Sequence, residues 1–398
     1  MRILIALPTE HPELPAIDSV INGTASCSGT TGSIIRLAAF LTEAGLDVCL
    51  SSACESKSTI FTCIKHQFVK TNQFDCLVVH QSHWDGTSLT FGNQNLGKTF
   101  LWFQNQTSWA FVHNFLRKGG NRIIVPSIYH ANIYRAVPQW RDKVTVIYNS
   151  YCPIFTPVVT PTQPRLLFIG AITPNKGVIQ LMEIWSYLVQ KQVNLKLAIA
   201  GSISIHKGSR GELGSLQIAE NNFETNQIKP WLTSLPQYYQ PYFLGALSPV
   251  QLRTEIAQSW AVIVNPSWEH AETFCVSAVD AQACDRTVFS VAVGGLKETV
   301  YQGNFNSLTK ERSVEAFGQQ IIAGLSHPDA VKENGLLAGN FVRNKFSYQS
   351  IRNAWIQVLS GQKTKPTISP HWNSSRDLLC DLMRWSRTGM LINQYIRS

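Results

Sequence analysis

The sequence of 398 residues lacks the features that mark membrane-spanning and secreted chains. No apolar run approaches the roughly 20 residues that a membrane-spanning helix needs. The first residues, Met1–Pro8, are too short for a signal peptide, and their pattern predicts a first strand instead. The nine cysteines are scattered without the paired spacing of a metal site. We therefore expect reduced thiols, no bound metal and a cytoplasmic protein.

Charge is also sparse, because only 15% of the residues are Asp, Glu, Lys or Arg. The net charge is +9, yet Lys and Arg form no run of the kind that marks a nucleic-acid surface. We therefore expect no nucleic-acid partner. The mild positive charge suits an anionic ligand and permits peripheral contact with an anionic membrane, although ordinary surface charge explains it equally well.

The length predicts two domains, and 44% hydrophobic residues are enough for two cores. Both halves alternate short apolar runs with helical patterns, which indicates an α/β fold with parallel sheets. Residues 151–164 contain four prolines and no charge, so they predict a stiff connector. The predicted parts are a first domain over 1–155, a second over 165–345, and terminal helices over 346–398.

The first domain opens in the order of a nucleotide-binding fold. A strand at Arg2–Leu7 is followed by a polar loop, a helix over Ile34–Ala44 and a strand from Val48. The loop carries Gly29 and Gly32, whose spacing does not match the dinucleotide pattern, so NAD is not expected.

A stretch over residues 260–300 carries most of the chemistry. Its predicted elements are a strand, a helix and a second strand, over Trp260–Val264, Phe274–Ala283 and Val288–Val293. The loop before the helix holds Glu269 and Glu272, and Asp280 lies on the helix. A helix start between parallel strands presents unpaired N–H groups that suit a phosphate, and nearby carboxylates can accept hydrogen bonds from sugar hydroxyls. The stretch therefore predicts a ligand with both phosphate and sugar.

This stretch resembles the donor-site motif of family-4 retaining glycosyltransferases, which have the GT-B fold. That motif has Pro-Ser, a Glu, a second Glu after seven residues, an Ala-Cys-like turn, and Gly-Gly-x-x-Glu. The matching residues are Pro266-Ser267, Glu272, Asp280, Ala283-Cys284, Gly294-Gly295 and Glu298. Asp280 replaces the second Glu of the family, and Cys275 replaces a Gly. The resemblance implies two Rossmann-like domains with a cleft between them, and C-terminal helices that cross back to the first domain.

The resemblance extends to three other places in the chain. After the strand that ends at Gly170, the family has an Arg and a Lys that neutralise the donor diphosphate; Lys176 is present, but Ala171 stands at the Arg position. Aligning the first helix puts Gly29 at a glycine that faces the donor phosphates. A strand that ends in His80 matches a family histidine near the transferred sugar, with His83 as a weaker alternative.

The resemblance therefore implies roles for named residues. The predicted catalytic residues are His80, Glu272 and Lys176. The predicted donor-binding residues are Gly29, Gly170, Lys176, Thr273, Phe274, Cys275, Val276 and Asp280. Glu272 would bind hydroxyls of the donor sugar, and Asp280 those of the ribose. The chain contains no Asp-x-Asp metal motif, so we expect metal-independent chemistry, with the nucleotide-diphospho-sugar as a co-substrate and no cofactor.

The function that the resemblance implies is transfer of a sugar, with retention of configuration, to a glycan, lipid-linked or small acceptor. Two alternatives stay open. One is another enzyme of the same fold, such as a nucleotide-sugar epimerase or a phosphorylase. The other is a non-catalytic glycosyltransferase-like binding protein, which the departures at Ala171, Cys275 and Asp280 favour. The base, the sugar and the acceptor are not identified by the sequence.

Overall fold

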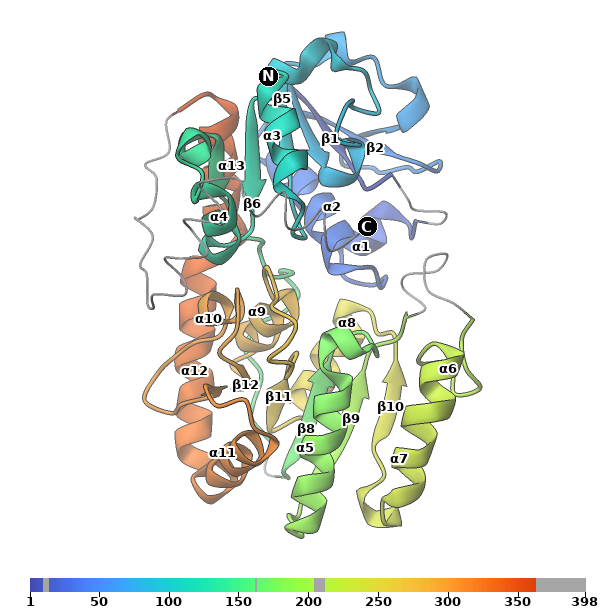
Figure 1. The fold of residues 1–398 in the computed structure, drawn as a ribbon, viewed down its shortest axis with the longest axis vertical. Coiled ribbons are helices and arrows are strands. Elements are labelled where there is room, and N and C mark those ends of the chain that lie inside the picture. Colours follow the sequence, from blue (N-terminus) through green and yellow to red (C-terminus); the bar gives the residue numbers. More distant parts are fainter. Residues whose placement is uncertain (10–13, 162, 204–211, 363–398) are drawn as a thin grey trace. The chain divides into compact units, whose positions relative to one another are not determined.

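The chain folds into two compact units in a computed structural model that describes residues 1–9, 14–161, 163–203 and 212–362 (Figure 1). Of the described residues, unit 1 holds those within 1–14, 37–148 and 351–362, and unit 2 holds those within 15–36 and 149–350. Residues 15–36, which the sequence places in the first domain, thus group with the second unit. The predicted terminal segment from residue 363 lies outside the described residues.

Unit 1 is built on a parallel sheet whose described strands run in the order β3-β2-β1-β4-β5-β6-β7. The strands are β1 (Arg2–Ala6), β2 (Asp47–Ser52), β3 (Thr62–Lys65), β4 (Cys76–His80), β5 (Thr99–Trp102), β6 (Arg122–Val125) and β7 (Val144–Val146). Its helices include α3 (Trp109–Arg117) and α4 (Ile128–Arg135). Central strands such as β4 are buried along their whole length, which explains their continuous apolar runs.

Helix α13 (Tyr348–Leu359) brings the end of the described chain back to unit 1. The Trp355 ring packs edge-on against Trp102 of β5, with ring centroids 4.9 Å apart. At the end of the helix, the Cys76 thiol donates to the Leu359 carbonyl oxygen over 3.7 Å. The helix thus covers the sheet of unit 1 with buried aromatic surface, as the predicted fold requires.

Unit 2 repeats the same architecture with the described strands in the order β10-β9-β8-β11-β12-β13. The strands are β8 (Arg165–Ile169), β9 (Lys196–Ala200), β10 (Tyr242–Gly245), β11 (Ala261–Ile263), β12 (Val288–Val291) and β13 (Leu308–Thr309). The helices are α1 (Ile17–Ile21), α5 (Val178–Gln190), α6 (Asn221–Phe223), α7 (Lys229–Ser234), α8 (Pro249–Ala257), α9 (Val276–Ala283), α10 (Leu296–Thr299), α11 (Val314–Ser326) and α12 (Pro328–Lys345). Helix α2 (Gly29–Glu43) begins in unit 2 and ends in unit 1. Two doubly wound parallel sheets confirm the predicted α/β class.

The strand order decides which helices share a face of the unit 2 sheet. The chain steps in one direction from β8 to β9 to β10, and in the opposite direction from β11 to β12. Right-handed crossovers therefore place α5, α6 and α7 on one face and α9 on the other. Trp231 of α7 donates its indole N–H to Ser186 of α5 over 3.1 Å, which confirms that these two helices are neighbours (Figure 1).

Two segments of unit 2 add to the sequence prediction. The polar stretch 212–240 contains α6, a π-helical turn at Glu224–Ile228 and α7. Its helical pattern is hidden because Glu224 points into the interior although it is charged. The connector 151–164 is held in part by the buried Arg286, whose guanidinium donates to the carbonyl oxygens of Val158 and Val159.

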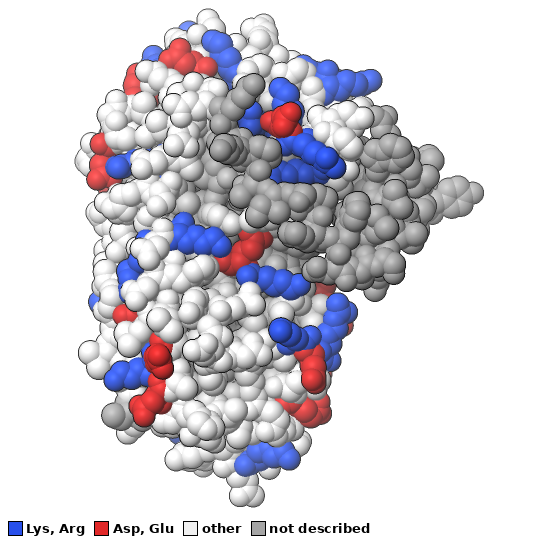
Figure 2. Space-filling model, turned by 90° about the vertical axis from the view of Figure 1, so that its left-hand side faces the viewer, with Lys and Arg blue, Asp and Glu red and all other residues white. Residues whose placement is uncertain are grey.

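The surface carries no continuous basic stripe on the face drawn in Figure 2, as far as its described residues show. Lys and Arg side chains there are interspersed with Asp and Glu. Within the described parts of the chain, no helix has both the length and the apolar character that crossing a membrane would require.

Candidate functional site

The loop that follows β8 is shaped by three glycines. The Gly170 N–H donates to the Ala200 carbonyl oxygen over 3.1 Å, and a side chain on Gly201 would collide with the Gly170 carbonyl. Gly177 has a φ of +76°, and an added Cβ would lie 2.7 Å from both Pro266 Cδ and the Ser267 nitrogen. The loop can therefore lie directly against the Pro266-Ser267 segment that follows β11.

This close approach brings Lys176 to Glu272. The Lys176 Nζ lies 2.6 Å from Glu272 Oε1, and the Asn265 side-chain amide donates to the same oxygen over 2.8 Å. The Glu272 side chain is 13% exposed and the Lys176 side chain 41%. The carboxylate is thus fixed by two donors, while the ammonium group retains access to solvent. Both residues follow strands at the point where the strand order reverses, where doubly wound sheets bind ligands.

The backbone between Glu272 and α9 is fixed by the glycine pair after β12. The Gly295 N–H donates to the Glu272 carbonyl oxygen over 2.7 Å, and a side chain on Gly295 would collide with the Thr273 carbonyl. Helix α9 then begins at Val276, where the N–H groups of the first turn have no carbonyl partner within the helix. Such a helix start attracts anions, particularly phosphate.

Gly29 lies at a second helix start beside the first. It is the first residue of α2, and an added Cβ would lie 3.6 Å from Val276 Cγ2, so the two helix starts are neighbours within unit 2. Cys275, which precedes α9, is buried, and burial raises the pKa of its thiol to about 12. A neutral thiol in that position serves packing rather than nucleophilic chemistry.

Asp280 faces the interior of unit 2 and is 8% exposed. Its Oδ1 accepts the Cys152 backbone N–H over 3.1 Å. Burial raises the pKa of this carboxyl to about 7, and the charge of the buried Arg36 and the Cys152 N–H oppose that rise. The structure thus gives Asp280 a backbone partner that its spacing in the motif did not indicate, and its role toward ribose stays a prediction.

His80 stands at the end of β4 in unit 1 and is buried. The Ser82 N–H donates to its Nδ1 over 3.2 Å, and the Ser82 hydroxyl lies 2.9 Å from the same nitrogen. Because Nδ1 accepts a hydrogen bond, the neutral ring carries its proton on Nε2. His80 can therefore act as a hydrogen-bond donor toward an oxygen.

The alternative histidine, His83, belongs to the core of unit 1. Its Nε2 lies 2.7 Å from the Leu7 carbonyl oxygen, and its ring stacks on Phe91 and meets His66 edge-on. Burial lowers its pKa to about 4, although the hydrogen bond to Leu7 opposes this shift. A neutral, packed imidazole of this kind is a structural residue.

The sequence prediction missed Asn265 and Arg36. Asn265 orients Glu272 and has a φ of +27°, a conformation that Asn adopts more readily than most residues. An Asn before Pro-Ser signals only a strand break, so the sequence gives no sign of this contact. No group of His, Cys, Asp and Glu among the described residues is arranged to hold a metal ion.

Comparisons with known proteins place these observations in a family. The sequence profile of the family described as glycosyl transferases group 1 matches residues 155–364. The chain is also similar to the lipopolysaccharide 1,2-N-acetylglucosaminetransferase of Salmonella typhimurium (strain LT2), with 26% identity over 234 residues, which cover 57% of this chain and 53% of that protein. The chain thus spans about half the length of this curated relative.

Solved structures show the same fold. Sucrose-phosphate synthase from Thermosynechococcus elongatus has a TM-score of 0.67 and 15% identity, over 90% of this chain and 98% of that chain. HepE from Anabaena, in complex with UDP and glucose, has a TM-score of 0.62 and 13% identity, over 91% and 100%. The predicted GT-B fold is thereby confirmed.

Proposed function

The chain belongs to the glycosyl transferases group 1 family, and from this premise we propose that it moves a sugar from a nucleotide-diphospho-sugar to an acceptor. The proposed acceptors are a glycan, a lipid-linked sugar or a small molecule. The proposal includes retention of anomeric configuration and no requirement for a divalent metal. The observation that carries it is the contact between Lys176 and Glu272 beside the start of α9.

The diphosphate of the donor would bind at the start of α9. The backbone N–H groups over Thr273–Val276 and the half-exposed Lys176 ammonium supply hydrogen bonds and positive charge. When the bond from the sugar C1 to the diphosphate breaks, its electron pair passes to the leaving oxygen. Fixed donors there stabilise the transition state more than the ground state, which lowers the barrier.

Glu272 would accept hydrogen bonds from hydroxyls of the donor sugar. Lys176 and Asn265 both contact its Oε1, so the orientation of the carboxylate is set before a ligand arrives. In the proposed front-face reaction, the acceptor oxygen bonds to C1 on the face that the leaving group vacates. The acceptor proton passes to a phosphate oxygen, so the reaction needs no protein nucleophile and retains the configuration.

The remaining predicted residues are kept as proposals. His80 would donate from Nε2 to an oxygen of the transferred sugar, and Gly29 would let the diphosphate approach the start of α2. Asp280 would bind ribose hydroxyls through Oδ2, since Oδ1 already accepts the Cys152 N–H. A cytoplasmic location, peripheral membrane contact and the absence of a nucleic-acid partner also stay predictions.

A thermal-shift screen with UDP, GDP, ADP and their sugars tests donor binding first. A ligand that binds the native state raises the melting temperature. Because the HepE structure contains UDP and glucose, UDP-glucose is the first donor to test. If no nucleotide or nucleotide-sugar stabilises the protein, the donor site is refuted.

Product analysis then separates the transferase from its alternatives. Incubation with the stabilising donor and no acceptor would yield an epimerised sugar from an epimerase, and nothing beyond slow hydrolysis from a transferase. With an acceptor present, NMR of the product anomeric proton reports retention or inversion, and a reaction in excess EDTA reports metal dependence. Donor binding without turnover for any acceptor class would favour the non-catalytic alternative.

A further inference from the structure

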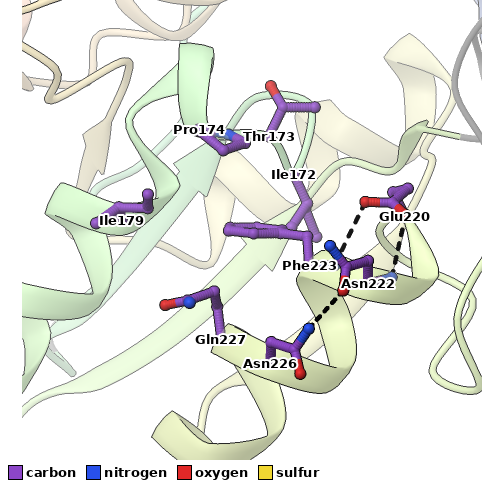
Figure 3. Close-up of a pocket in the computed structure, with 9 residues that line it drawn as sticks. All are labelled: Ile172, Thr173, Pro174, Ile179, Glu220, Asn222, Phe223, Asn226 and Gln227. Atoms are coloured by element: carbon purple, nitrogen blue, oxygen red, sulfur yellow. Dashed lines mark hydrogen bonds between the residues drawn. The ribbon is translucent and has the colours of Figure 1, made fainter.

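A cavity in unit 2 is lined by residues that include neither Lys176 nor Glu272 (Figure 3). Its volume is about 470 Å³, within the range of small-molecule binding sites. The walls come from the loop around Ile172–Pro174, from Ile179 on α5, and from the segment Glu220–Gln227. All of these residues belong to unit 2.

The topology separates this cavity from the proposed donor site. Its walls are α5 and the α6 segment, which share one face of the sheet, whereas α9 lies on the other face. The loop after β8 serves both places, because Lys176 reaches Glu272 while Thr173 and Pro174 line the cavity. A ligand here would therefore lie beside the donor loop without occupying the start of α9.

The polar wall of the cavity consists mainly of carboxamides. Both oxygens of Glu220 accept backbone N–H groups, from Asn222 at 3.1 Å and from Phe223 at 3.4 Å. The Asn226 side-chain amide nitrogen donates to Asn222 Oδ1 (Figure 3). Asn222 then retains amide protons to donate, Asn226 retains its carbonyl oxygen as an acceptor, and Gln227 offers both kinds of group.

The charge of the lining argues against an anionic ligand. Among the described residues that line the cavity there is one carboxylate, Glu220, and no Lys, Arg or His. A phosphate or nucleotide would meet a negative charge with no cation to offset it. The carboxamide groups instead match hydroxyls, since each hydroxyl both donates and accepts hydrogen bonds.

The opposite wall is apolar. Ile172, Pro174 and Ile179 form it, and the Phe223 ring extends from its helix toward them (Figure 3). An apolar surface with an aromatic ring packs against the C–H face of a pyranose, while its hydroxyls reach the carboxamides. A neutral saccharide can therefore pack against the apolar wall and form hydrogen bonds with the carboxamide wall at the same time.

The helix at this wall is distorted in a way that supports a binding role. Glu224 is fully buried, and its Oε1 accepts the Leu216 N–H over 2.5 Å, which anchors the segment that precedes α6. The turn from Glu224 to Ile228 is π-helical, a form that occurs mostly as single turns within α-helices and is frequent at functional sites. Asn226 and Gln227 lie within this wider turn and face the cavity together.

We propose that this cavity binds a neutral saccharide at a site separate from the donor site. The cavity would then be a second binding site for a glycan, in addition to any contact made during transfer. The inference does not rest on turnover, because binding here requires neither Lys176 nor Glu272.

Saturation-transfer NMR with three neutral probes tests the proposal: maltotriose, cellotriose and tri-N-acetylchitotriose. At least one should bind the full chain at concentrations up to about 20 mM, which saturates a site of millimolar affinity. Phe223→Ala and Asn222→Ala should each weaken that binding by roughly fivefold or more, as expected for a lost contact of this size. Asn221→Ala, at an exposed neighbour outside the cavity, should leave the affinity unchanged.

Three results would overturn the proposal: no binding of any probe, equal binding by the wild type and both cavity variants, or displacement of the probe by UDP. Displacement would assign the cavity to the nucleotide. Because Asn222 is exposed, its variant should fold even if Phe223→Ala does not, and melting temperatures check this. Lys176→Ala should lose transfer and still bind the probe, so failure of the transferase proposal and failure of this one are distinguishable.

Discussion

Lys176 Nζ lies 2.6 Å from Glu272 Oε1, although the two residues are 96 positions apart in the chain. The contact forms because β8 and β11 are neighbouring parallel strands whose carboxyl ends meet at one edge of the sheet. Gly177 lets the loop after β8 lie against Pro266, and the Asn265 amide holds the Glu272 carboxylate in place. A cation and a carboxylate are thereby fixed beside the start of α9.

Removing either partner should impair transfer. Lys176→Ala and Glu272→Ala should each lower kcat/KM by about 2–4 kcal/mol of transition-state stabilisation, because in the proposed reaction Lys176 offsets the diphosphate charge and Glu272 binds hydroxyls of the donor sugar. Glu269→Ala and Lys332→Ala are matched controls, since both side chains are exposed and Glu269 shares the loop with Glu272. Initial rates with the donor found by thermal shift provide the measurement. Unchanged rates in both site variants would remove the assignment.

Gly177→Ala should destabilise unit 2 and displace the loop. The residue would be held at a φ of +76°, which costs about 1–3 kcal/mol for a non-glycine residue, and its Cβ would press on Pro266 and Ser267. Gly45→Ala is the control, because Gly45 has a φ of +82° with nothing within 4 Å of an added Cβ. Urea unfolding should show a larger loss for Gly177→Ala. Equal losses would mean that the contact with Pro266 contributes nothing.

The loop after β8 shows how much of the site could be predicted from the sequence. The resemblance assigned Lys176 and Glu272 to one donor site, and the structure places the two side chains in contact. Their roles toward the donor stay predictions. The sequence could not show that Asn265 turns toward Glu272, since this depends on a backbone angle rather than on residue type. It also could not show that Asp280 accepts the N–H of Cys152. The two residues are 128 positions apart, and only the tertiary fold brings them together.

The sequence also could not decide between His80 and His83, because the difference between them depends on tertiary packing. His80 is the last residue of β4 and His83 lies three residues later, so local pattern cannot separate them. The packing of His83 distinguishes it, because its ring contacts Phe91 and His66 and its Nε2 lies within hydrogen-bond distance of the Leu7 carbonyl oxygen. The π-helical turn after Glu220 escaped prediction for a related reason, since a buried Glu224 breaks the apolar periodicity that marks a helix.

NMR titration should test the packing of His83. The ring protons of His83 should keep their shifts from about pH 8 to about pH 5, because burial lowers its pKa to about 4. Its folded pKa lies below its unfolded value, so its contribution to stability should fall as the pH drops from the unfolded pKa toward the folded one. His80→Ala should reduce turnover with little change in melting temperature, and His83→Ala the reverse. Titration of His83 near its ordinary pKa would contradict the packing described for it.

Asp280 should make the protein less stable as the pH rises. Its folded pKa is raised to about 7 by burial, so between about pH 4 and pH 7 the native state holds a proton that the unfolded chain releases. Stability should therefore decline across that window, by at most about 1.4 kcal/mol per pH unit from this group, and level off above it.

Asp280→Asn should remove that decline, because the amide keeps an oxygen for the Cys152 N–H and never ionises. Urea unfolding of both proteins from about pH 4 to about pH 8 gives the difference curve, which should increasingly favour the variant up to about pH 7. Asp329→Asn, at an exposed position of α12, is the matched control. A flat difference curve for Asp280→Asn would mean that the carboxylate stays ionised throughout. Donor binding should oppose the wild-type decline, since ribose hydroxyls that donate to Oδ2 favour the ionised form of Asp280.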